Sequence, residues 1–523
     1  MSLFDDALAI VRSGVLRPLG PRTTFELTRL LIREGFKAHL IYALHGTQNA
    51  NKPALIHDGR ITTWGELLDR MKRLANHLVS LGAGKQHGVA VMLPNRPEFL
   101  EANAAALRIG ARLSFINPRA PAADAKSLVD RAGAGVLVTH REDVETGGAV
   151  LRTSESYELA IAEAPSGDPP VDRSAKSEVV VFTSGTTGRP KGAVRSFESS
   201  VSPKLAGGFL RLLPFKTSDV HMVVCPLYHA SGSGFATIGQ VLGNTLVLVE
   251  KFSPEAFCRH VQEHKVTTTC VVPTMLHQLA SWDGVRDYDL SSLRVVVCTG
   301  SPLREEVRKE ARDLLGDVVY DLYGSTEMAM VTIATPEDQT RKPGSVGKPV
   351  PGVDVRITDA EGNALPPGER GEIWASSAAR MTGYIDDPEL TDERLRDGYV
   401  SVRDVGYLDD DGYLFVVDRA DDMIISGGVN VYPAETEVAL NGHPKVDESA
   451  VLGVSDPKWG QKIVAAVVLS EEVTEDELIT WCKENASYAA VPKEVRFLDT
   501  LPRNDIGKID KKALAAGWNE VTT

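Results

Sequence analysis

The sequence predicts an α/β protein in which a large N-terminal domain of helix-covered sheets plus a β-subdomain precedes a smaller α+β domain. Its 523 residues are enough for two to four folding units at about 150 residues each. Hydrophobic residues make up 43% and charged residues 24%, as in globular proteins and unlike disordered or coiled-coil chains. From about residue 50 to 350, short β-branched runs alternate with helical stretches, which is the rhythm of strand–helix units.

Residues 23–45 predict one amphipathic helix, because their apolar side chains recur at helical spacing. These side chains are Phe25, Leu30, Phe36, Leu40 and Leu44. The N-terminal segment 1–45 carries six basic and four acidic residues, whereas the whole chain has a formal net charge of −14. In one reading the helix lies on an anionic lipid surface, as a peripheral membrane contact. In the other it packs on its own protein and exposes its basic face to solvent.

The large domain is expected to span residues 46–418. Five β-branched runs in it predict buried strands, at residues 179–182, 221–224, 245–249, 267–272 and 295–298. Ser253 can cap a helix whose first position is Pro254. After residue 350 turn-rich short strands follow, and from residue 433 helices and strands return. A small C-terminal domain is therefore expected at 419–523, with a loop before its last helix.

Composition argues against several classes of function. The chain has 57 Lys and Arg against 71 Asp and Glu, so it lacks the general basic surface that binds nucleic acid. Its five cysteines contain no CxxC pair, which argues against a disulfide framework or a zinc site. No run of about 18 apolar residues occurs, and the N-terminus is unlike a signal peptide. We therefore expect a cytoplasmic protein, with membrane contact only through the N-terminal helix.

The segment VVVFTSGTTGRPKGAV, residues 179–194, predicts a phosphate-binding loop after a buried strand. Its glycines let successive backbone N–H groups approach an anion, and its hydroxyls and lysine add donors and a positive charge. The P-loop pattern GxxxxGK[ST] cannot be fitted to it, which disfavours a P-loop NTPase. The residues concerned are Thr183, Ser184, Gly185, Thr186, Thr187, Gly188, Lys191 and Gly192.

This segment resembles the signature of the adenylate-forming, or AMP-binding, superfamily, and the chain looks most like its bacterial fatty acyl-CoA synthetases. Further blocks of that family follow in the expected order over residues 53–511: PLYHASG (226–232), VVPTM (271–275), TGSPL (299–303), YDLYGSTEM (320–328), GYLDDDGYLFVVDRADDMIISGGVNVYP (406–433) and PRNDIGKI (502–509). The resemblance implies that a carboxylic acid attacks the α-phosphate of ATP and that coenzyme A then displaces AMP. It also implies ATP, Mg²⁺ and coenzyme A as cofactors.

The resemblance further implies the residues that bind the nucleotide. Tyr323 would stack on adenine, and Thr326 would reach the α-phosphate. Asp404 and Arg419 would bind the ribose. The full set consists of the loop residues Thr183, Ser184, Gly185, Thr186, Thr187, Gly188 and Lys191, with Gly300, Ser301, Pro302, Asp321, Leu322, Tyr323, Gly324, Ser325, Thr326, Asp404, Arg419 and Lys508. Relatives carry Thr-Gly-Asp where this chain has Val402-Arg403-Asp404, which puts the ribose loop in question.

Catalysis would rest on Lys508, Thr326, Glu327 and Lys191, with Lys508 bridging the carboxylate and the phosphate. Thr186 and Glu327 would hold Mg²⁺, because a hard cation prefers oxygen ligands. The resemblance implies a mobile small domain that turns about Asp421. Its rotation would bring Gly427 and Gly428 to a tunnel for the coenzyme A arm.

The acid is expected to bind in a pocket whose residues carry no charge: His229, Gly234, Met275, Gly300 and Met328. Residues 235–238 lack the aspartate that amino-acid-activating relatives use, so an amino-acid substrate is disfavoured. A medium- or long-chain fatty acid is the favoured substrate. The alternatives are an aryl-CoA ligase, a loader of acyl-adenylate onto a carrier protein and a luciferase-like enzyme. A non-catalytic AMP-binding regulator is disfavoured because Lys508 and Glu327 are both present.

Overall fold

The computed structural model describes residues 3–170, 172, 174–183, 190–196, 203–419, 422–426, 429–456, 459–503 and 509–520. The chain divides into two compact units. Unit 1 comprises Met1–Val355 and Ala375–Val400, and unit 2 comprises Arg356–Trp374 and Ser401–Thr523. The expected domain limits after residues 45 and 418 do not coincide with this division, and they stay predictions.

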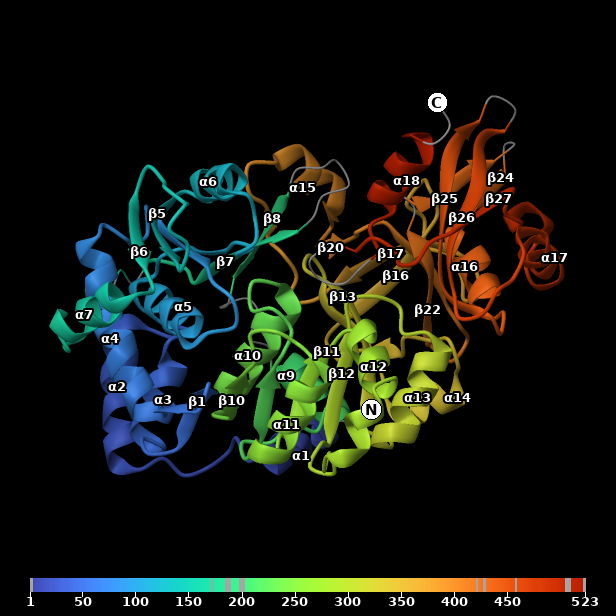
Figure 1. Ribbon diagram of the computed structural model, residues 1–523. Helices are drawn as coiled ribbons and strands as arrows, with labels where there is room; N and C mark the ends of the chain where they lie inside the picture. Colours follow the sequence, from blue (N-terminus) through green and yellow to red (C-terminus); the bar gives the residue numbers. More distant parts are fainter. Residues whose placement is uncertain are drawn as a thin grey trace. The chain divides into compact units, whose positions relative to one another are not determined.

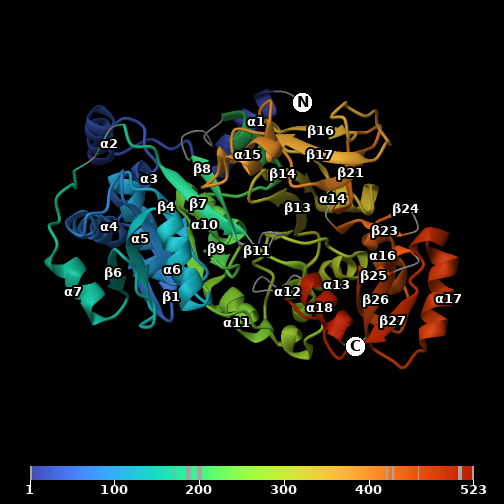
Figure 2. The same cartoon turned by 90° about the horizontal axis from the view of Figure 1, so that it is seen from above.

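A seven-stranded sheet of unit 1 has the order β18-β8-β7-β4-β3-β5-β6. Strands β8, β7, β4 and β6 of this sheet are labelled in Figure 2. Strands β7, β4, β3, β5 and β6 are parallel, while β8 and β18 are antiparallel at one edge. The strands are β3 (Gly88–Met92), β4 (Leu113–Phe115), β5 (Ala134–Thr139), β6 (Ala149–Arg152), β7 (Glu178–Thr183), β8 (Lys191–Ser196) and β18 (Gly383–Tyr384). Their helices are α4 (Trp64–Ser80), α5 (Pro97–Ile109), α6 (Ala122–Arg131) and α7 (Glu155–Glu163).

A nine-stranded sheet of unit 1 has the order β15-β14-β13-β12-β11-β9-β10-β1-β2. Strands β13, β12, β11, β10 and β1 of this sheet are labelled in Figure 1. Its six central strands, from β13 to β1, are parallel. The strands are β1 (Pro53–His57), β2 (Arg60–Thr63), β9 (Val220–Val223), β10 (Thr245–Leu248), β11 (Thr268–Val271), β12 (Val295–Thr299), β13 (Val319–Ser325), β14 (Ala329–Ala334) and β15 (Lys348–Pro349). The five β-branched runs predicted as strands are thus confirmed as β7, β9, β10, β11 and β12.

Helices cover both faces of the nine-stranded sheet. Along β12, Val296 and Cys298 enter one core cluster while Val295 and Val297 enter another, which is the two-residue period of a strand buried on both sides. The helices are α9 (Pro203–Leu212), α10 (Ala230–Leu242), α11 (Pro254–His264), α12 (Pro273–Ala280), α13 (Glu305–Leu315) and α14 (Pro336–Arg341), with a 3₁₀ turn η1 (Asp283–Asp287). The predicted cap is confirmed, because Ser253 accepts a hydrogen bond from the backbone of Ala256.

The N-terminal segment forms three helices, α1 (Leu3–Ser13), α2 (Pro21–Glu34) and α3 (Leu40–Gln48), so the prediction of one helix over 23–45 is wrong. Gly35 ends α2 with φ +78°, a conformation that glycine adopts without strain. The predicted apolar face is also divided, because Leu30 and Leu40 are buried whereas Phe25 and Phe36 are exposed. Unit 1 is completed by α15 (Pro388–Arg394), β19 (Leu395–Arg396) and β20 (Tyr399–Val400).

Unit 2 begins with turn-linked short strands, as the sequence predicts. Strands β16 (Asp354–Thr358) and β17 (Gly371–Ser376) border its first segment. The other elements are β21 (Asp404–Leu408), β22 (Leu414–Arg419), β23 (Ile424–Ser426), β24 (Val429–Val431), α16 (Pro433–Asn441), β25 (Val446–Asp456), β26 (Gly460–Leu469), α17 (Glu475–Asn485), the 3₁₀ turn η3 (Tyr488–Ala490), β27 (Glu494–Phe497) and α18 (Lys511–Glu520). The antiparallel pair β25–β26 carries one core cluster on each face.

Among the helices that the structure describes, none combines the length and apolar character needed to cross a bilayer. All five cysteines are buried free thiols in this structure.

Candidate active site

The predicted phosphate loop connects two antiparallel strands. Thr183 at the end of β7 pairs with Lys191 at the start of β8, and the Thr183 hydroxyl donates to the Lys191 carbonyl at 3.3 Å. The tip with Ser184, Gly185, Thr186, Thr187 and Gly188 lies outside the described residues. Gly192 serves packing, because a Cβ there would meet the Ile385 side chain at 2.6 Å. The predicted phosphate loop therefore connects the two strands of a β-hairpin, β7 and β8.

Most of the other predicted site residues follow the carboxyl ends of parallel strands in the nine-stranded sheet. Because β9, β11, β12 and β13 run parallel, the segments after them emerge at the same edge. His229 follows β9, Met275 follows β11, and Gly300 follows β12 directly. Gly300 has φ +96° and leads Ser301 and Pro302 away from the strand. The fold thus gathers distant sequence blocks at one edge, where ligands of open α/β sheets bind.

The hairpin between β13 and β14 carries the predicted nucleotide and metal residues. Its turn is fixed by Ser325, whose hydroxyl accepts from the backbone N–H groups of Glu327 at 3.2 Å and Met328 at 3.0 Å. Gly324 is required there, since a Cβ would lie 2.1 Å from the Ala329 carbonyl oxygen. Tyr323 and Thr326 are half-buried on the same hairpin. The backbone thereby holds Thr326 and Glu327 in one tight turn.

Glu327 is buried and is held by groups from two other segments. The Tyr384 hydroxyl donates to Glu327 Oε1 at 3.2 Å, and the Met381 N–H donates to the Glu327 carbonyl at 2.8 Å. Burial raises the pKa of Tyr384, and the negative charge of Glu327 raises it further. Arg195 on β8 adds a positive charge near Glu327 and donates to the Ala379 carbonyl at 2.9 Å. A fixed carboxylate thus lies beside the strand that begins with Lys191.

Asp321 and Leu322 are buried inside the sheet. The Asp321 carboxylate pairs with Arg308 at 3.3 Å, and burial raises the pKa of Asp321 to about 6 although Arg308 opposes this shift. The Leu322 carbonyl accepts from the Thr299 hydroxyl at 2.8 Å. Their contact with a nucleotide stays a prediction; in this structure Asp321 ties β13 to α13, and Leu322 ties β13 to β12.

The predicted acyl-pocket residues come from four different segments. His229 directly precedes α10, and its ring centre lies 4.3 Å from that of Tyr228 in a tilted arrangement. Gly234 lies one turn further, and a Cβ added to it would have no atom within 4 Å beyond its chain neighbours and the backbone of its own helix. Met275 is half-buried on α12, and Met328 is buried after the β13 hairpin. The open space at Gly234 therefore adjoins the first turns of α10, which carry no charged side chain.

In unit 2 the two predicted ribose residues are neighbours. Asp404 on β21 pairs with Arg419 on β22, and their side chains lie 3.6 Å apart. Arg403 has φ +65°, so it adopts the left-handed backbone that the glycine of relatives favours. Its N–H donates to the Ser401 hydroxyl at 2.9 Å. Arg403 therefore keeps the backbone conformation of this turn, although it replaces a glycine.

Four predicted residues of unit 2, namely the hinge Asp421, the tunnel residues Gly427 and Gly428 and the catalytic Lys508, lie outside the described residues. Sequence reasoning in turn missed Tyr384 and Arg195. Arg195 shares a face of β8 with Lys191 at a spacing of four residues, which is a usable signal. Tyr384 has no such signal, because it reaches β8 only through the pairing of β18.

Known proteins resemble this chain over most of its length. A family model described as AMP-binding enzyme matches residues 43–385, and one described as AMP-binding enzyme C-terminal domain matches residues 435–508. The chain is 37% identical to a feruloyl-CoA synthase of Amycolatopsis sp over 88% of this chain and 94% of that protein. It is 33% identical to a 2-succinylbenzoate–CoA ligase of Bacillus licheniformis, over 89% and 96% of the two chains.

Two further proteins extend the comparison. A fatty acid–[acyl-carrier-protein] ligase of Streptomyces coeruleorubidus is 31% identical over 90% of this chain and 94% of that protein. Among solved structures, o-succinylbenzoate CoA synthetase of Bacillus subtilis in complex with its acyl-adenylate intermediate superposes with a TM-score of 0.81. That pair is 29% identical and covers 91% of this chain and 97% of the other.

Proposed function

Because the chain belongs to the family of AMP-binding enzymes, we propose that it is an AMP-forming ligase that joins an aryl carboxylic acid to coenzyme A. The observation that carries this proposal is the 37% identity to a feruloyl-CoA synthase over 88% of the chain. Likeness to o-succinylbenzoate CoA synthetase, which acts on another aryl acid, supports the same class. The fatty acid favoured by the sequence is therefore replaced by its aryl alternative.

The candidate acyl pocket is compatible with a planar ring. None of His229, Gly234, Met275, Gly300 and Met328 carries a fixed charge, and Gly234 leaves open space on α10. A ring of the benzoate or cinnamate type would enter this space more easily than a charged chain. A second candidate is transfer of a fatty acyl group to a carrier protein, which the 31% identity to the Streptomyces coeruleorubidus ligase favours.

In the first half-reaction a carboxylate oxygen of the acid attacks the α-phosphorus of ATP, and the bond to the departing pyrophosphate breaks. Lys191 and the hydroxyl and backbone donors of the 183–191 loop would neutralise phosphate charge and fix the line of attack. Lys508 would bridge the two anions. In the second half-reaction the coenzyme A sulfur attacks the acyl carbon, the bond to AMP breaks, and AMP departs with the acid oxygen.

Mg²⁺ fits the donor set around Glu327. The carboxylate is buried and held by Tyr384, so an oxygen ligand of the kind that a hard cation prefers is fixed in place. Glu327 with Thr186 would hold the ion, which when bound would neutralise phosphate charge.

In unit 2, we assign Asp404 and Arg419 to the ribose. The two side chains pair on adjacent strands, so a carboxylate acceptor and a guanidinium donor lie together. Such a pair can form hydrogen bonds with the two hydroxyls of one ribose, because a hydroxyl both donates and accepts. Asp421 would serve as the hinge, and Gly427 and Gly428 would line the coenzyme A tunnel.

A panel of acids tests the substrate class. Benzoates, hydroxycinnamates and straight-chain acids from acetate to stearate are compared by AMP release, with free coenzyme A or with a phosphopantetheinylated carrier protein as the acceptor. The proposal predicts the highest kcat/KM for a hydroxycinnamate or benzoate with free coenzyme A. Preference for a long-chain acid, or dependence on the carrier protein, would contradict it.

A further inference from the structure

The N-terminal helices expose an unusual amount of apolar surface. Of the sixteen large apolar side chains that are exposed in the described residues, eight lie between residues 11 and 36. They are Val11, Val15, Leu16, Leu19, Phe25, Leu31, Ile32 and Phe36, and we call them the N-terminal apolar surface. Phe25 and Ile32 are 70% and 71% exposed, although apolar side chains of this size are mostly buried in globular proteins. Leu19, Phe25 and Ile32 line one groove, and apolar side chains grouped in this way mark an interaction site.

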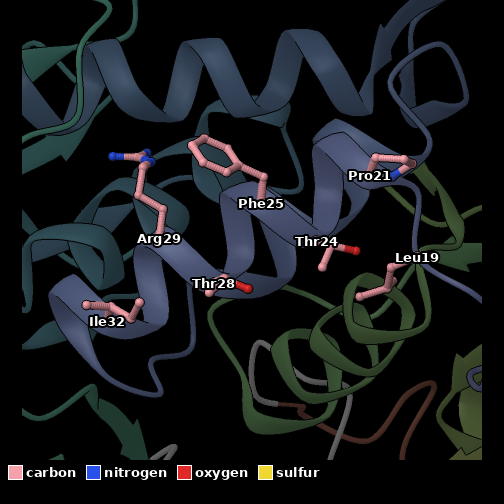
Figure 3. Close-up of a pocket in the computed structure, with 7 residues that line it drawn as sticks. All are labelled: Leu19, Pro21, Thr24, Phe25, Thr28, Arg29 and Ile32. Atoms are coloured by element: carbon pink, nitrogen blue, oxygen red, sulfur yellow. The ribbon is translucent and has the colours of Figure 1, made fainter.

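Helix α2 is apolar on two sides. Its inner side packs Leu27 and Leu30 against Leu40 and Ala43 of α3. Phe25 and Ile32 are seven residues apart, so they lie on one outer face. Figure 3 shows both side chains on α2, together with Leu19 and Pro21 near its start. A shallow groove of about 820 Å³ runs between these residues.

Buried ion pairs hold this helix in position. Glu34 at the end of α2 accepts from Arg108 at 2.5 Å and from His39 at 2.8 Å, and all three side chains are at most 1% exposed. Asp168 binds Arg29 of α2 at 2.6 Å and Lys72 of α4 at 3.3 Å. The exposure of Phe25 and Ile32 is therefore a property of the folded unit, not of a frayed end.

Three exposed arginines occur in the same stretch of chain as the apolar side chains. Within the part of the chain that the structure describes, the exposed Arg12, Arg17 and Arg22 make no ion pair, whereas the acids of α2, Glu26 and Glu34, are both paired. This arrangement is found in a chain of net charge −14. Exposed apolar side chains and exposed arginines in one segment match the interface of an anionic bilayer, where the apolar groups insert and the arginines meet lipid phosphates.

We propose that the N-terminal apolar surface, with Arg12, Arg17 and Arg22, docks the protein onto anionic membranes. A symmetric contact between two copies would bring the same three arginines of each copy together, and their repulsion disfavours that occupant. The matched family domain begins at residue 43, so the surface lies on a segment that the family domain does not include. Docking therefore goes beyond the proposed ligase activity and needs none of its site residues.

The test uses the full chain and flotation with vesicles. Vesicles of phosphatidylcholine with phosphatidylglycerol are compared with phosphatidylcholine alone, at low and high salt. The unaltered protein should float with the anionic vesicles, and salt should weaken its binding because it screens the arginines. Replacing Arg12, Arg17 and Arg22 by Gln should reduce affinity about fivefold for each arginine. The pair Phe25→Ser and Ile32→Ser should reduce it about tenfold or more, because less apolar area inserts.

Matched controls separate this proposal from its rivals. Leu159→Ser with Val438→Ser removes two apolar side chains of similar exposure, 58% and 73%, outside the surface and should leave binding unchanged. AMP release with a soluble acid should be unchanged in Phe25→Ser with Ile32→Ser, which also verifies folding. The proposal is overturned if the unaltered protein does not float with anionic vesicles, or if both variant pairs lose binding equally. It is also overturned if sedimentation without lipid shows a dimer that Phe25→Ser with Ile32→Ser abolishes.

Discussion

Replacing Glu34 by Gln should weaken the attachment of helix α2 to unit 1 by about 3 kcal/mol at neutral pH. The Glu34 side chain is fully buried. Burial by itself raises its pKa, but the hydrogen bond from His39 and the charge of Arg108 outweigh that effect and lower the pKa from 4.5 to about 2. A shift of this size at about 1.4 kcal/mol per pKa unit gives about 3 kcal/mol. That value is at the lower end of the cost of about 3–5 kcal/mol for breaking a buried ion pair.

The pH dependence has a defined sign. Because folding lowers the pKa of Glu34, its stabilising contribution is complete above the unfolded value of 4.5 and is lost as the pH falls toward 2. The difference between the unaltered protein and Glu34→Gln should therefore be largest near neutral pH and should disappear in strong acid.

Hydrogen exchange of the α2 and α3 backbone amides measures this difference locally. At neutral pH the amides of Glu34→Gln should exchange about 100-fold faster, since about 1.4 kcal/mol corresponds to a factor of ten. Glu26→Gln is the matched control, because Glu26 is 19% exposed and pairs with the partly exposed Arg29, a contact worth less than about 1 kcal/mol. Equal exchange in both variants, or no acceleration in Glu34→Gln, would refute the argument from burial.

Three further predictions concern the active site. Tyr384→Phe removes a hydrogen bond to a buried carboxylate, worth about 1.5–3 kcal/mol, so half-saturation by Mg²⁺ should move to higher concentration and the temperature of thermal unfolding should fall. An unchanged Mg²⁺ titration would contradict the positioning of Glu327 by Tyr384. Gly234→Leu should lower kcat/KM for a cinnamate about tenfold or more without unfolding the protein, because the leucine fills the open space of the acyl pocket. Gly324→Ala should instead abolish AMP release, because its Cβ displaces the turn that holds Glu327. Equal effects of the two variants on a small acid such as acetate would contradict the pocket assignment. Lys508→Ala should slow acyl-adenylate formation about 100-fold or more yet leave thioester formation from supplied acyl-adenylate much less affected, and equal loss in both steps would remove Lys508 from its proposed role.

Local patterns were sufficient to predict the buried strands and the start of α11. Continuous β-branched runs occur at β7, β9, β10, β11 and β12, because a strand covered on both faces has no polar side. Ser253 and Pro254 mark a helix start by the same local chemistry. Such features depend on a few neighbouring residues, and the sequence therefore contains them directly.

Contacts between distant segments could not be predicted in this way. The single helix expected over 23–45 is interrupted after Glu34, whose partner Arg108 is 74 residues away in the sequence. Helical periodicity predicted that Phe25 and Leu30 share one buried face. In the structure Leu30 packs against α3, whereas Phe25 is exposed. Tyr384 reaches Glu327 because β18 pairs with β8, a contact that no local pattern encodes.

The central claim is that a carboxylate oxygen of the substrate attacks the α-phosphorus of ATP, and an isotope measurement tests it most directly. An aryl acid whose carboxylate carries heavy oxygen is turned over with ATP and coenzyme A, and the released AMP is analysed by mass spectrometry. The mechanism predicts one labelled oxygen in each AMP molecule, because the acid oxygen stays on phosphorus when the thiol displaces AMP. Unlabelled AMP, with the label retained in the acid or found in inorganic phosphate, would contradict it.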